Sequence, residues 1–394
     1  MDYGQVILKS GKDQSVKRYH PWIFSGAIKK TLGNFREGDV VQVFNNKEEF
    51  LGLGHYQPAT IAVRIISFEN RPIDEAFWRE KLSGAMDLRK QLSYIGNEET
   101  NVFRLVNAEG DGFPGLIIDY YNGVAVMQAH SVGMYRNKEL FTEILKDLLG
   151  NSLLAVYDKS SSSLPYNASV EKVNRYIFGN PADQLVKENG MHFYVNWEEG
   201  QKTGFFIDQR EHRRLLKNYA QNARVLNLFG YTGGFSVYAA AGGCKRVVSV
   251  DSSSGATELA EKNMKLNFHN HTDHYALAKE AFNYLRNTEE QFDIIILDPP
   301  AFAKHHKVLP NALQGYKKLN RLALEKVQPG GLIFTFSCSQ VVSREEFRKT
   351  VFTASANTGR RVRILHQLSQ PADHPVSVYH PEGEYLKGLV LRVE

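Results

Sequence analysis

The chain has 394 residues, of which 42% are hydrophobic and 23% charged, so it is long enough for two or three packed domains and unlike a disordered protein. Its formal net charge of +5 is compatible with an anionic partner such as RNA without requiring one. Two cysteines exclude a disulfide framework and a cysteine-rich zinc site, and we expect no bound metal. Because no apolar run is long enough to span a membrane and no signal-peptide pattern opens the chain, we expect a cytoplasmic protein.

Residues 1–72 carry short β-rich runs separated by turn residues, which is typical of a small barrel. These runs are residues 5–8, 39–44, 50–54 and 61–66. Basic residues, among them Lys12 and Arg18, precede Trp22 and Phe24. Such a group can hold RNA phosphate and stack a base. The alternative interpretation is that the aromatic side chains belong to the core and the basic side chains only cover a surface. The sequence favours neither interpretation.

Residues 73–188 have the pattern of a connecting α+β domain, and residues 71–72 form the linker before it. A helical pattern follows Asp74, which has the side chain of an N-cap. We then expect strands at 103–106, 116–119, 124–127 and 153–157, with a helix near 134–149 before the last of them. The loop at 107–115 is rich in residues that tolerate positive φ, so we interpret it as a structural turn.

From residue 189 to 394 strands and helices alternate, which predicts an α/β domain with a Rossmann-like parallel sheet. An apolar strand at 224–229 runs into a glycine-rich turn, a helix follows at 235–241, and the next strand ends on Asp251. The turn and the acid are about 20 residues apart, as in nucleotide-type sites. Because the turn lacks a regular G-x-G-x-x-G pattern, we favour S-adenosylmethionine (SAM) over a dinucleotide as the cofactor.

Two further predicted strands end in residues that are suited to chemistry. The strand at 292–297 ends in Asp298, Pro299 and Pro300, and the strand at 332–336 is followed by Cys338. The carboxyl ends of parallel strands form the edge where open α/β sheets bind ligands. Asp298 suits the amino group of a methyl donor or the orientation of a base, and the prolines leave a flat surface against which a base can lie.

Cys338 is the sharpest of these observations. A lone cysteine is usually a small buried hydrophobe, which is our interpretation of Cys244. A thiolate at the edge of the sheet can instead attack C6 of a pyrimidine and make C5 nucleophilic enough to accept a methyl group. Methylation of a ring nitrogen or an exocyclic amine needs no such cysteine.

Several segments together make the chain similar to one bacterial family, the SAM-dependent 5-methylcytosine methyltransferases of large-subunit ribosomal RNA. The segments are residues 201–210, 229–235, 298–302, 337–339, 372–375 and 381–388. Residues 20–28 also resemble the start of a PUA RNA-binding domain. The resemblance spans the chain. It implies a PUA-like RNA-binding β-barrel at 1–72, a central α+β domain at 73–188 and a class I methyltransferase domain at 189–394 that ends in an antiparallel hairpin.

The resemblance and the strand-end positions together give a set of candidate site residues. The catalytic candidates are Cys338 and Asp298. The candidates for binding SAM are Lys202, Thr203, Phe205, Gln209, Arg210, Phe229, Tyr231, Thr232, Gly233, Gly234, Asp251, Ser252, Glu280 and Asp298. The candidates for binding ribosomal RNA are Lys12, Arg18, Trp22, Pro299, Pro300, Phe302, Lys304 and Asp373.

Two departures from the family pattern and several alternatives stay open. Glu280 stands alone where relatives have an acidic pair, and Ala301 stands where two-cysteine enzymes have their second cysteine, so Cys338 works alone. Asp298 and Asp373 are candidates for the base that removes the C5 proton, whereas His374 is expected to be structural. The alternative functions are methylation of a guanine nitrogen and a non-catalytic RNA-binding role in ribosome assembly. A homodimer is also left open.

Overall fold

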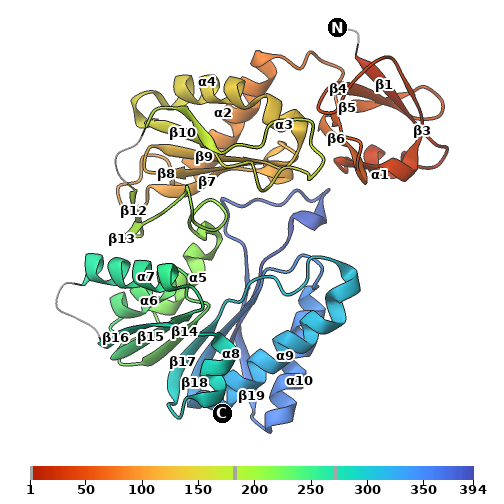
Figure 1. Cartoon of the computed structure of the whole chain (residues 1–394). Coiled ribbons are helices and arrows are strands. Elements are labelled where there is room, and N and C mark those ends of the chain that lie inside the picture. The colour runs from red at the N-terminus through yellow and green to blue at the C-terminus, as the bar shows by residue number, and fades with distance from the viewer. Residues whose placement is uncertain (1–2, 181–183, 269–272) are drawn as a thin grey trace. The chain divides into compact units, whose positions relative to one another are not determined.

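The computed structural model describes residues 3–180, 184–268 and 273–394, and it divides into two compact units (Figure 1). The first unit consists of Met1–Val186, Val195–Ile207 and Ala372–Gly383. The second consists of Lys187–Tyr194, Asp208–Pro371 and Glu384–Glu394. The chain therefore passes from one unit to the other five times. None of the helices in the described ranges combines the length and apolarity needed to cross a bilayer.

The N-terminal part of the first unit is a six-stranded sheet with the order β2-β6-β5-β4-β1-β3. Its strands are β1 (Gly4–Leu8), β2 (Trp22–Phe24), β3 (Ile28–Leu32), β4 (Val40–Phe44), β5 (Phe50–Tyr56) and β6 (Ile61–Ser67), with the short helix α1 (Gln14–Lys17) after β1. Alternate residues such as Val41 and Val43 are fully buried, which gives the sheet one apolar face. The β-rich prediction is confirmed, although β2 and β3 are not among the predicted strands.

The rest of the first unit is built on a five-stranded sheet with the order β11-β10-β9-β8-β7. Its elements are α2 (Glu75–Gln91), β7 (Val102–Asn107), β8 (Leu116–Tyr121), β9 (Val124–Ala129), α3 (Val132–Arg136), α4 (Lys138–Leu149), β10 (Ala155–Asp158) and β11 (Arg175–Phe178). Asp74 caps α2 as predicted, because its Oδ1 accepts the N–H of Phe77 at 3.0 Å. The single helix predicted near 134–149 is instead two helices that meet at Asn137.

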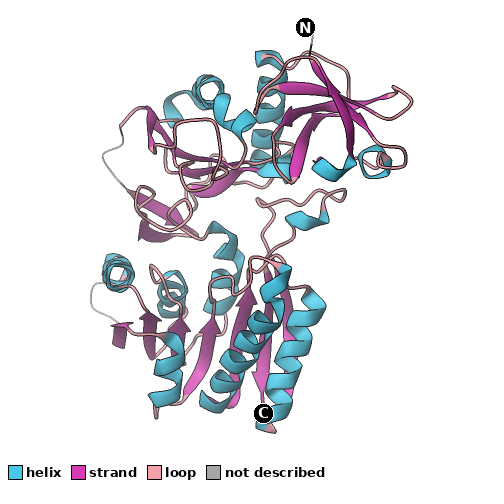
Figure 2. Ribbon diagram, turned by 45° about the vertical axis from the view of Figure 1, so that its right-hand side comes forward, coloured by secondary structure: helices cyan, strands magenta, loops and turns pink. Residues whose placement is uncertain are grey.

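The second unit is built on a seven-stranded sheet with the order β16-β15-β14-β17-β18-β20-β19. Figure 2 shows its strands as magenta arrows beside cyan helices. Its strands are β14 (Arg224–Leu228), β15 (Arg246–Asp251), β16 (Asp273–Ala278), β17 (Phe292–Leu297), β18 (Val327–Ser337), β19 (Val362–Ser369) and β20 (Lys387–Val393). The strands β14 to β18 are parallel, and β20 is antiparallel to both of its neighbours. The predicted terminal hairpin is confirmed.

Helices cover both faces of this sheet, which is why its central strands are almost wholly apolar. Side chains of α5 (Arg210–Lys217), α6 (Gly234–Ala241) and α7 (Ser254–Asn267) pack on one face. Those of α8 (Ala281–Asn287), α9 (Leu309–Lys326) and α10 (Arg344–Thr358) pack on the other. Before α5, β12 (Leu185–Glu188) and β13 (Met191–Tyr194) form a separate two-stranded sheet.

The chain order reverses at the centre of the large sheet. From β14 the chain adds β15 and β16 on one side, and it then crosses back to add β17 and β18 on the other. The carboxyl ends of β14 and β17 thus flank the switch point, where ligands bind in sheets of this kind. The predicted strands at this edge are confirmed. β16 is not among them: none of its residues is fully buried, and it lacks the apolar run of a central strand.

Candidate functional site

The turn between β14 and α6 is tightly wound. Phe229, Tyr231 and Gly233 all have positive φ, at 57°, 44° and 78°. Left-handed backbone is costly for residues with a side chain, so the surroundings must hold it in place. Two bonds do so: the N–H of Gly230 donates to the Val250 carbonyl at 3.0 Å, and the N–H of Tyr231 donates to Asp251 Oδ2 at 2.9 Å. The turn is therefore locked to the end of β15.

The glycines of this turn are required first by packing. A Cβ on Gly233 would lie 2.9 Å from the Cβ of Ala260 in α7, and its φ would be unfavourable as well. A Cβ on Gly234 would lie 3.1 Å from Cδ of Arg213 in α5. The glycines thus let α6 begin between two neighbouring helices. The first N–H groups of α6 have no partner within the helix, so they are available to a ligand.

Asp251 has the geometry of a ribose-binding acid. Its Oδ1 accepts the N–H of Ser253 at 3.0 Å while Oδ2 accepts that of Tyr231, and the side chain is half-buried. Each carboxylate oxygen has a second lone pair, so both can still accept a hydroxyl group. The free lone pairs of this carboxylate therefore fit the paired ribose hydroxyls of a nucleoside, which would donate to them. Ser252, also a candidate, is exposed beside it.

Asp298, at the end of β17, is the most perturbed carboxyl group at this edge. Burial raises its pKa to about 7, and the nearby Asp208 acts in the same direction, while Arg213 and Gln209 oppose the rise. Its Oδ1 accepts a hydrogen bond from Nε2 of Gln209 at 2.9 Å. At neutral pH the group is therefore divided between its protonated and ionised forms, which suits proton transfer.

A histidine that the sequence did not single out orients Gln209. Nδ1 of His212 lies 2.5 Å from Oε1 of Gln209, and burial lowers the pKa of this imidazole to about 4. His212 is thus neutral at pH 7 and donates through Nδ1, which leaves the amide N–H of Gln209 for Asp298. The sequence gives no sign of this role, because His212 acts through Gln209, and the contact of Gln209 with Asp298 forms only in the folded chain.

Cys338 lies beside the Asp298–Pro300 loop. The thiol is half-buried, and Sγ is 3.8 Å from the carbonyl oxygen of Pro299. The flanking Ser337 and Ser339 are buried, and both hydroxyls bond to the phenol of Tyr316 at 3.0 Å. These bonds fix the backbone on each side of the cysteine. Cys244, by contrast, is 2% exposed, and burial raises the pKa of its thiol to about 11.

Two further SAM candidates, Thr232 and Glu280, follow the carboxyl ends of β14 and β16 at the same edge, but each is bound within the fold. Glu280 is the N-cap of α8, where its two carboxylate oxygens accept the N–H groups of Phe282 and Asn283. Thr232 is buried, and its carbonyl accepts a bond from Asn263.

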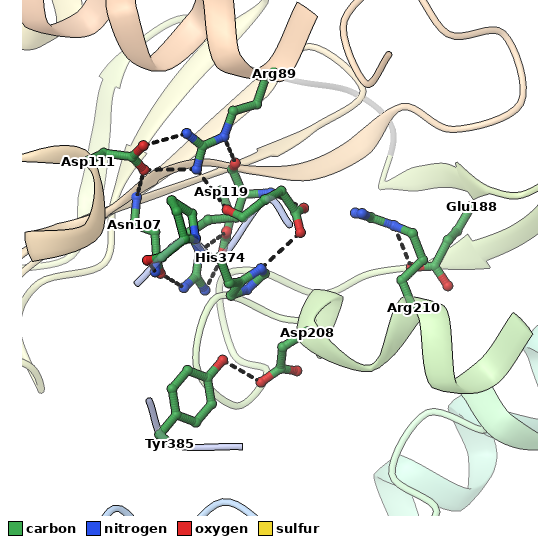
Figure 3. A network of polar contacts seen from close by, with 12 residues as sticks. Arg89, Asn107, Asp111, Asp119, Glu188, Asp208, Arg210, His374 and Tyr385 are labelled. Atoms are coloured by element: carbon green, nitrogen blue, oxygen red, sulfur yellow. Dashed lines mark hydrogen bonds and ion pairs between the residues drawn. The ribbon is translucent and has the colours of Figure 1, made fainter. Parts of the chain in front are cut away.

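The predicted segment 201–210 is divided between the two units. Lys202, Thr203 and Phe205 belong to the first unit, and Thr203 donates to Asp119 at 2.6 Å there. Gln209 and Arg210 belong to the second unit. Figure 3 shows Arg210 against Glu188, with Nε and Oε2 3.6 Å apart.

The RNA candidates have diverse surroundings. Trp22 is half-buried: its indole N–H donates to Glu109 at 2.8 Å, and its ring lies 4.4 Å from that of His380. This environment matches neither a free stacking platform nor a core position. Lys12, Arg18, Pro300 and Lys304 are exposed, Pro299 is buried, and Phe302 is half-buried against Tyr316.

Asp373 belongs to a buried polar network of the first unit, and Figure 3 shows Arg89, Asp111 and His374 of this network. Its Oδ2 accepts the N–H of Arg104 at 3.0 Å, and its Oδ1 lies 3.0 Å from Nδ1 of His374. Its main-chain carbonyl accepts a bond from Arg89, which is itself paired with Asp111 at 2.6 Å. Both oxygens of this carboxylate are therefore engaged. The network anchors the connection between β19 and β20 in the first unit, which no local pattern indicates.

Comparisons with known proteins show the family to which the chain is similar. A family model for S-adenosylmethionine-dependent methyltransferases matches residues 112–381, and one for a PUA-like domain matches residues 6–68. The chain is 40% identical over 395 residues to ribosomal RNA large subunit methyltransferase I of Alteromonas mediterranea, covering 99% of this chain and 98% of that one. It is 36% identical over 396 residues to the protein of the same name from Escherichia coli, with 99% of each chain covered.

Solved structures show the same similarity. A candidate SAM-dependent methyltransferase from Streptococcus mutans superposes with a TM-score of 0.84 at 26% identity, covering 98% of this chain and 99% of that one. A second structure, of a candidate methyltransferase complexed with SAH, gives a TM-score of 0.85 at 26% identity with the same coverage.

Proposed function

The chain belongs to the SAM-dependent methyltransferases, in the family of ribosomal RNA large subunit methyltransferase I, and on this premise we propose that it methylates C5 of a cytosine in large-subunit ribosomal RNA. The reaction proceeds through a covalent bond between Cys338 and C6 of the base. The observation that carries the proposal is the half-buried Cys338 thiol, 3.8 Å from the carbonyl of Pro299 in the loop that begins with Asp298. Methylation at a ring nitrogen would not require a cysteine nucleophile at this position.

The residues at the sheet edge divide the binding of SAM among them. Asp251 accepts the ribose hydroxyls through the lone pairs that Tyr231 and Ser253 leave free, and the N-terminal turn of α6 faces the same ligand. When bound, SAM supplies a methyl group on a positively charged sulfur, which a carbon nucleophile can take. Gln209 belongs to the site through Asp298, whose carboxyl group it orients. For Lys202, Thr203 and Phe205 we keep a role in binding SAM as part of the proposal.

Cys338 and Asp298 act together on the base. The Cys338 thiolate adds to C6, the electron pair moves through C5 and C4 to N3, and the protonated Asp298 gives its proton to N3. C5 is then nucleophilic and would take the methyl group, whose bond to the sulfur of SAM would break to leave S-adenosylhomocysteine. Asp298 takes back the N3 proton, the C5 proton passes to a base, and the C6–S bond breaks to restore the thiolate. A carboxyl group with a pKa of about 7 can both give and accept this proton.

Trapping of the covalent intermediate tests the proposal. RNA that carries 5-fluorocytidine at the target has no C5 proton to lose, so the enzyme should stay bound through the C6–S bond and migrate as a denaturation-resistant complex. The Cys338→Ala variant should form none, while Cys244→Ala should form as much as the wild type because that thiol is buried. If Cys338→Ala still methylates ribosomal RNA, a different base atom is the acceptor and the proposal is wrong.

A further inference from the structure

Lys387 is a buried lysine next to the proposed nucleophile. It is the first residue of β20, where it pairs across the antiparallel ladder with Ser337, the last residue of β18. Only 4% of it is exposed, and its Nζ donates to the carbonyl oxygen of Ser339 at 2.6 Å. Its backbone therefore lies opposite the residue before Cys338, and its ammonium group binds the residue after it.

The backbone of β20 leaves the lysine little freedom. A Cβ on the next residue, Gly388, would lie 2.6 Å from the ring of Phe336 in β18, so only glycine permits this close approach of the two strands. The Lys387 side chain thus starts from a fixed point and reaches a fixed acceptor. This geometry differs from that of a surface lysine, whose long side chain samples many rotamers.

The ammonium group of Lys387 is not paired with a carboxylate in the described ranges. A buried ammonium group is costly unless an opposite charge accompanies it, yet within the described ranges no carboxylate forms an ion pair with this lysine. Burial lowers the pKa of Lys387 to about 8, and the charge that acts most strongly against this effect is the Cys338 thiolate.

The other charged groups that face Lys387 have weaker effects and are occupied elsewhere. Arg344 lowers the pKa of Lys387, whereas Glu384 and Glu346 raise it. Glu384 is paired with Arg344, and Glu346 accepts the N–H of Ser343 in the capping box of α10. The thiolate of Cys338 is therefore the main group left to balance the ammonium.

We propose that Lys387 is a positioning residue that holds Cys338 as its thiolate. The attraction is mutual: a thiolate that favours the charged lysine is favoured by it to the same extent. The thiolate, and not the thiol, is the attacking species, so Lys387 increases the active fraction of Cys338 at neutral pH. The consequence for catalysis rests on the proposed function, but the effect on the thiol does not.

The test is the rate at which iodoacetamide alkylates Cys338 between pH 6 and pH 9.5, measured on the full chain by mass spectrometry of the Cys338 peptide. In the wild type we expect the alkylation rate to reach half of its maximum at a midpoint pH below about 8.5, the value for a free cysteine. In Lys387→Met the rate at pH 7 falls about tenfold and the midpoint moves upward. Lys326→Met is the matched control, because Lys326 also donates to a carbonyl, that of Thr288 at 2.6 Å, and its loss leaves the rate unchanged.

Two results would overturn the inference. One is a wild-type midpoint at or above that of a free cysteine, which can be measured even if Lys387→Met fails to fold. The other is a Lys387→Met profile that coincides with the wild type. The assay uses neither RNA nor SAM, so it separates this inference from the proposed function. If Cys338→Ala still methylates RNA while the alkylation profile shifts as expected, the cytosine mechanism fails and the role of Lys387 stands.

Discussion

The substitution Asp298→Asn should stabilise the protein at alkaline pH while it abolishes activity. The folded state holds the proton of Asp298 up to about pH 7, whereas the unfolded chain releases it near the ordinary value of 3.8. Between these values the folded state binds more protons, so the stabilisation is full below pH 3.8 and is lost as the pH rises to about 7. Asparagine has no proton to lose and keeps an oxygen for the Nε2 bond of Gln209.

The magnitude follows from the size of the pKa change. A rise from 3.8 to about 7 corresponds to about 4 kcal/mol, of which about 2 to 3 kcal/mol falls between pH 5 and pH 8. We compare the melting temperature of Asp298→Asn with that of the wild type at each pH. For a domain of this size, the difference should be about 5 to 10 °C more favourable to the variant at pH 8 than at pH 5. Thermal unfolding followed by circular dichroism at the two pH values measures it.

Asp293→Asn is the matched control. Asp293 lies in the same strand β17, but its side chain is partly exposed and pairs with Arg224. The difference in melting temperature between this variant and the wild type should be the same at pH 5 and pH 8. If the melting-temperature difference between Asp298→Asn and the wild type is also the same at pH 5 and pH 8, the carboxyl group of Asp298 ionises as it would in water. The proton-transfer role that we give to Asp298 is then wrong.

Three further substitutions test the framework of the site. Gly233→Ala should cost about 1 to 3 kcal/mol of unfolding free energy in a denaturant titration, because of its positive φ and its contact with α7; an unchanged midpoint contradicts this. Glu188→Gln should cost about 3 to 5 kcal/mol, since it leaves the buried Arg213 without its carboxylate; a loss no larger than that of Glu75→Gln on the surface refutes it. Asp251→Ala should weaken S-adenosylhomocysteine binding about 10- to 100-fold in calorimetry, and equal affinity would remove Asp251 from the site.

The sequence predicts those parts of the structure whose signals are local. An apolar run that ends in Asp298 or Cys338 identifies a buried parallel strand and its carboxyl end, because both signals lie within ten residues. The cap at Asp74 and the glycine turn before α6 are local in the same sense. Since parallel strands share one edge, the sequence also predicts that Asp251, Asp298 and Cys338 lie along the same side of the sheet.

Long-range pairings are what local patterns miss. Asp373 bonds to Arg104, which lies 269 residues earlier, and only the folded chain shows that this acid belongs to the first unit. His212 acts through its bond to Gln209, and Lys387 acts through its bond at the end of β18. A single histidine or lysine in the sequence does not predict either bond. The segment 201–210 resembles its relatives as one motif, yet its residues are divided between two compact units.

The central claim is the bond between Cys338 and C6 of a cytosine, and peptide mass spectrometry of the trapped complex tests it most directly. After 5-fluorocytidine RNA is incubated with the enzyme and SAM and digested to nucleosides, the peptide that contains Cys338 should carry the added mass of a methylated 5-fluorocytidine. A modified nucleoside on any other residue, or methylated RNA that is released with every cysteine unmodified, would contradict the account.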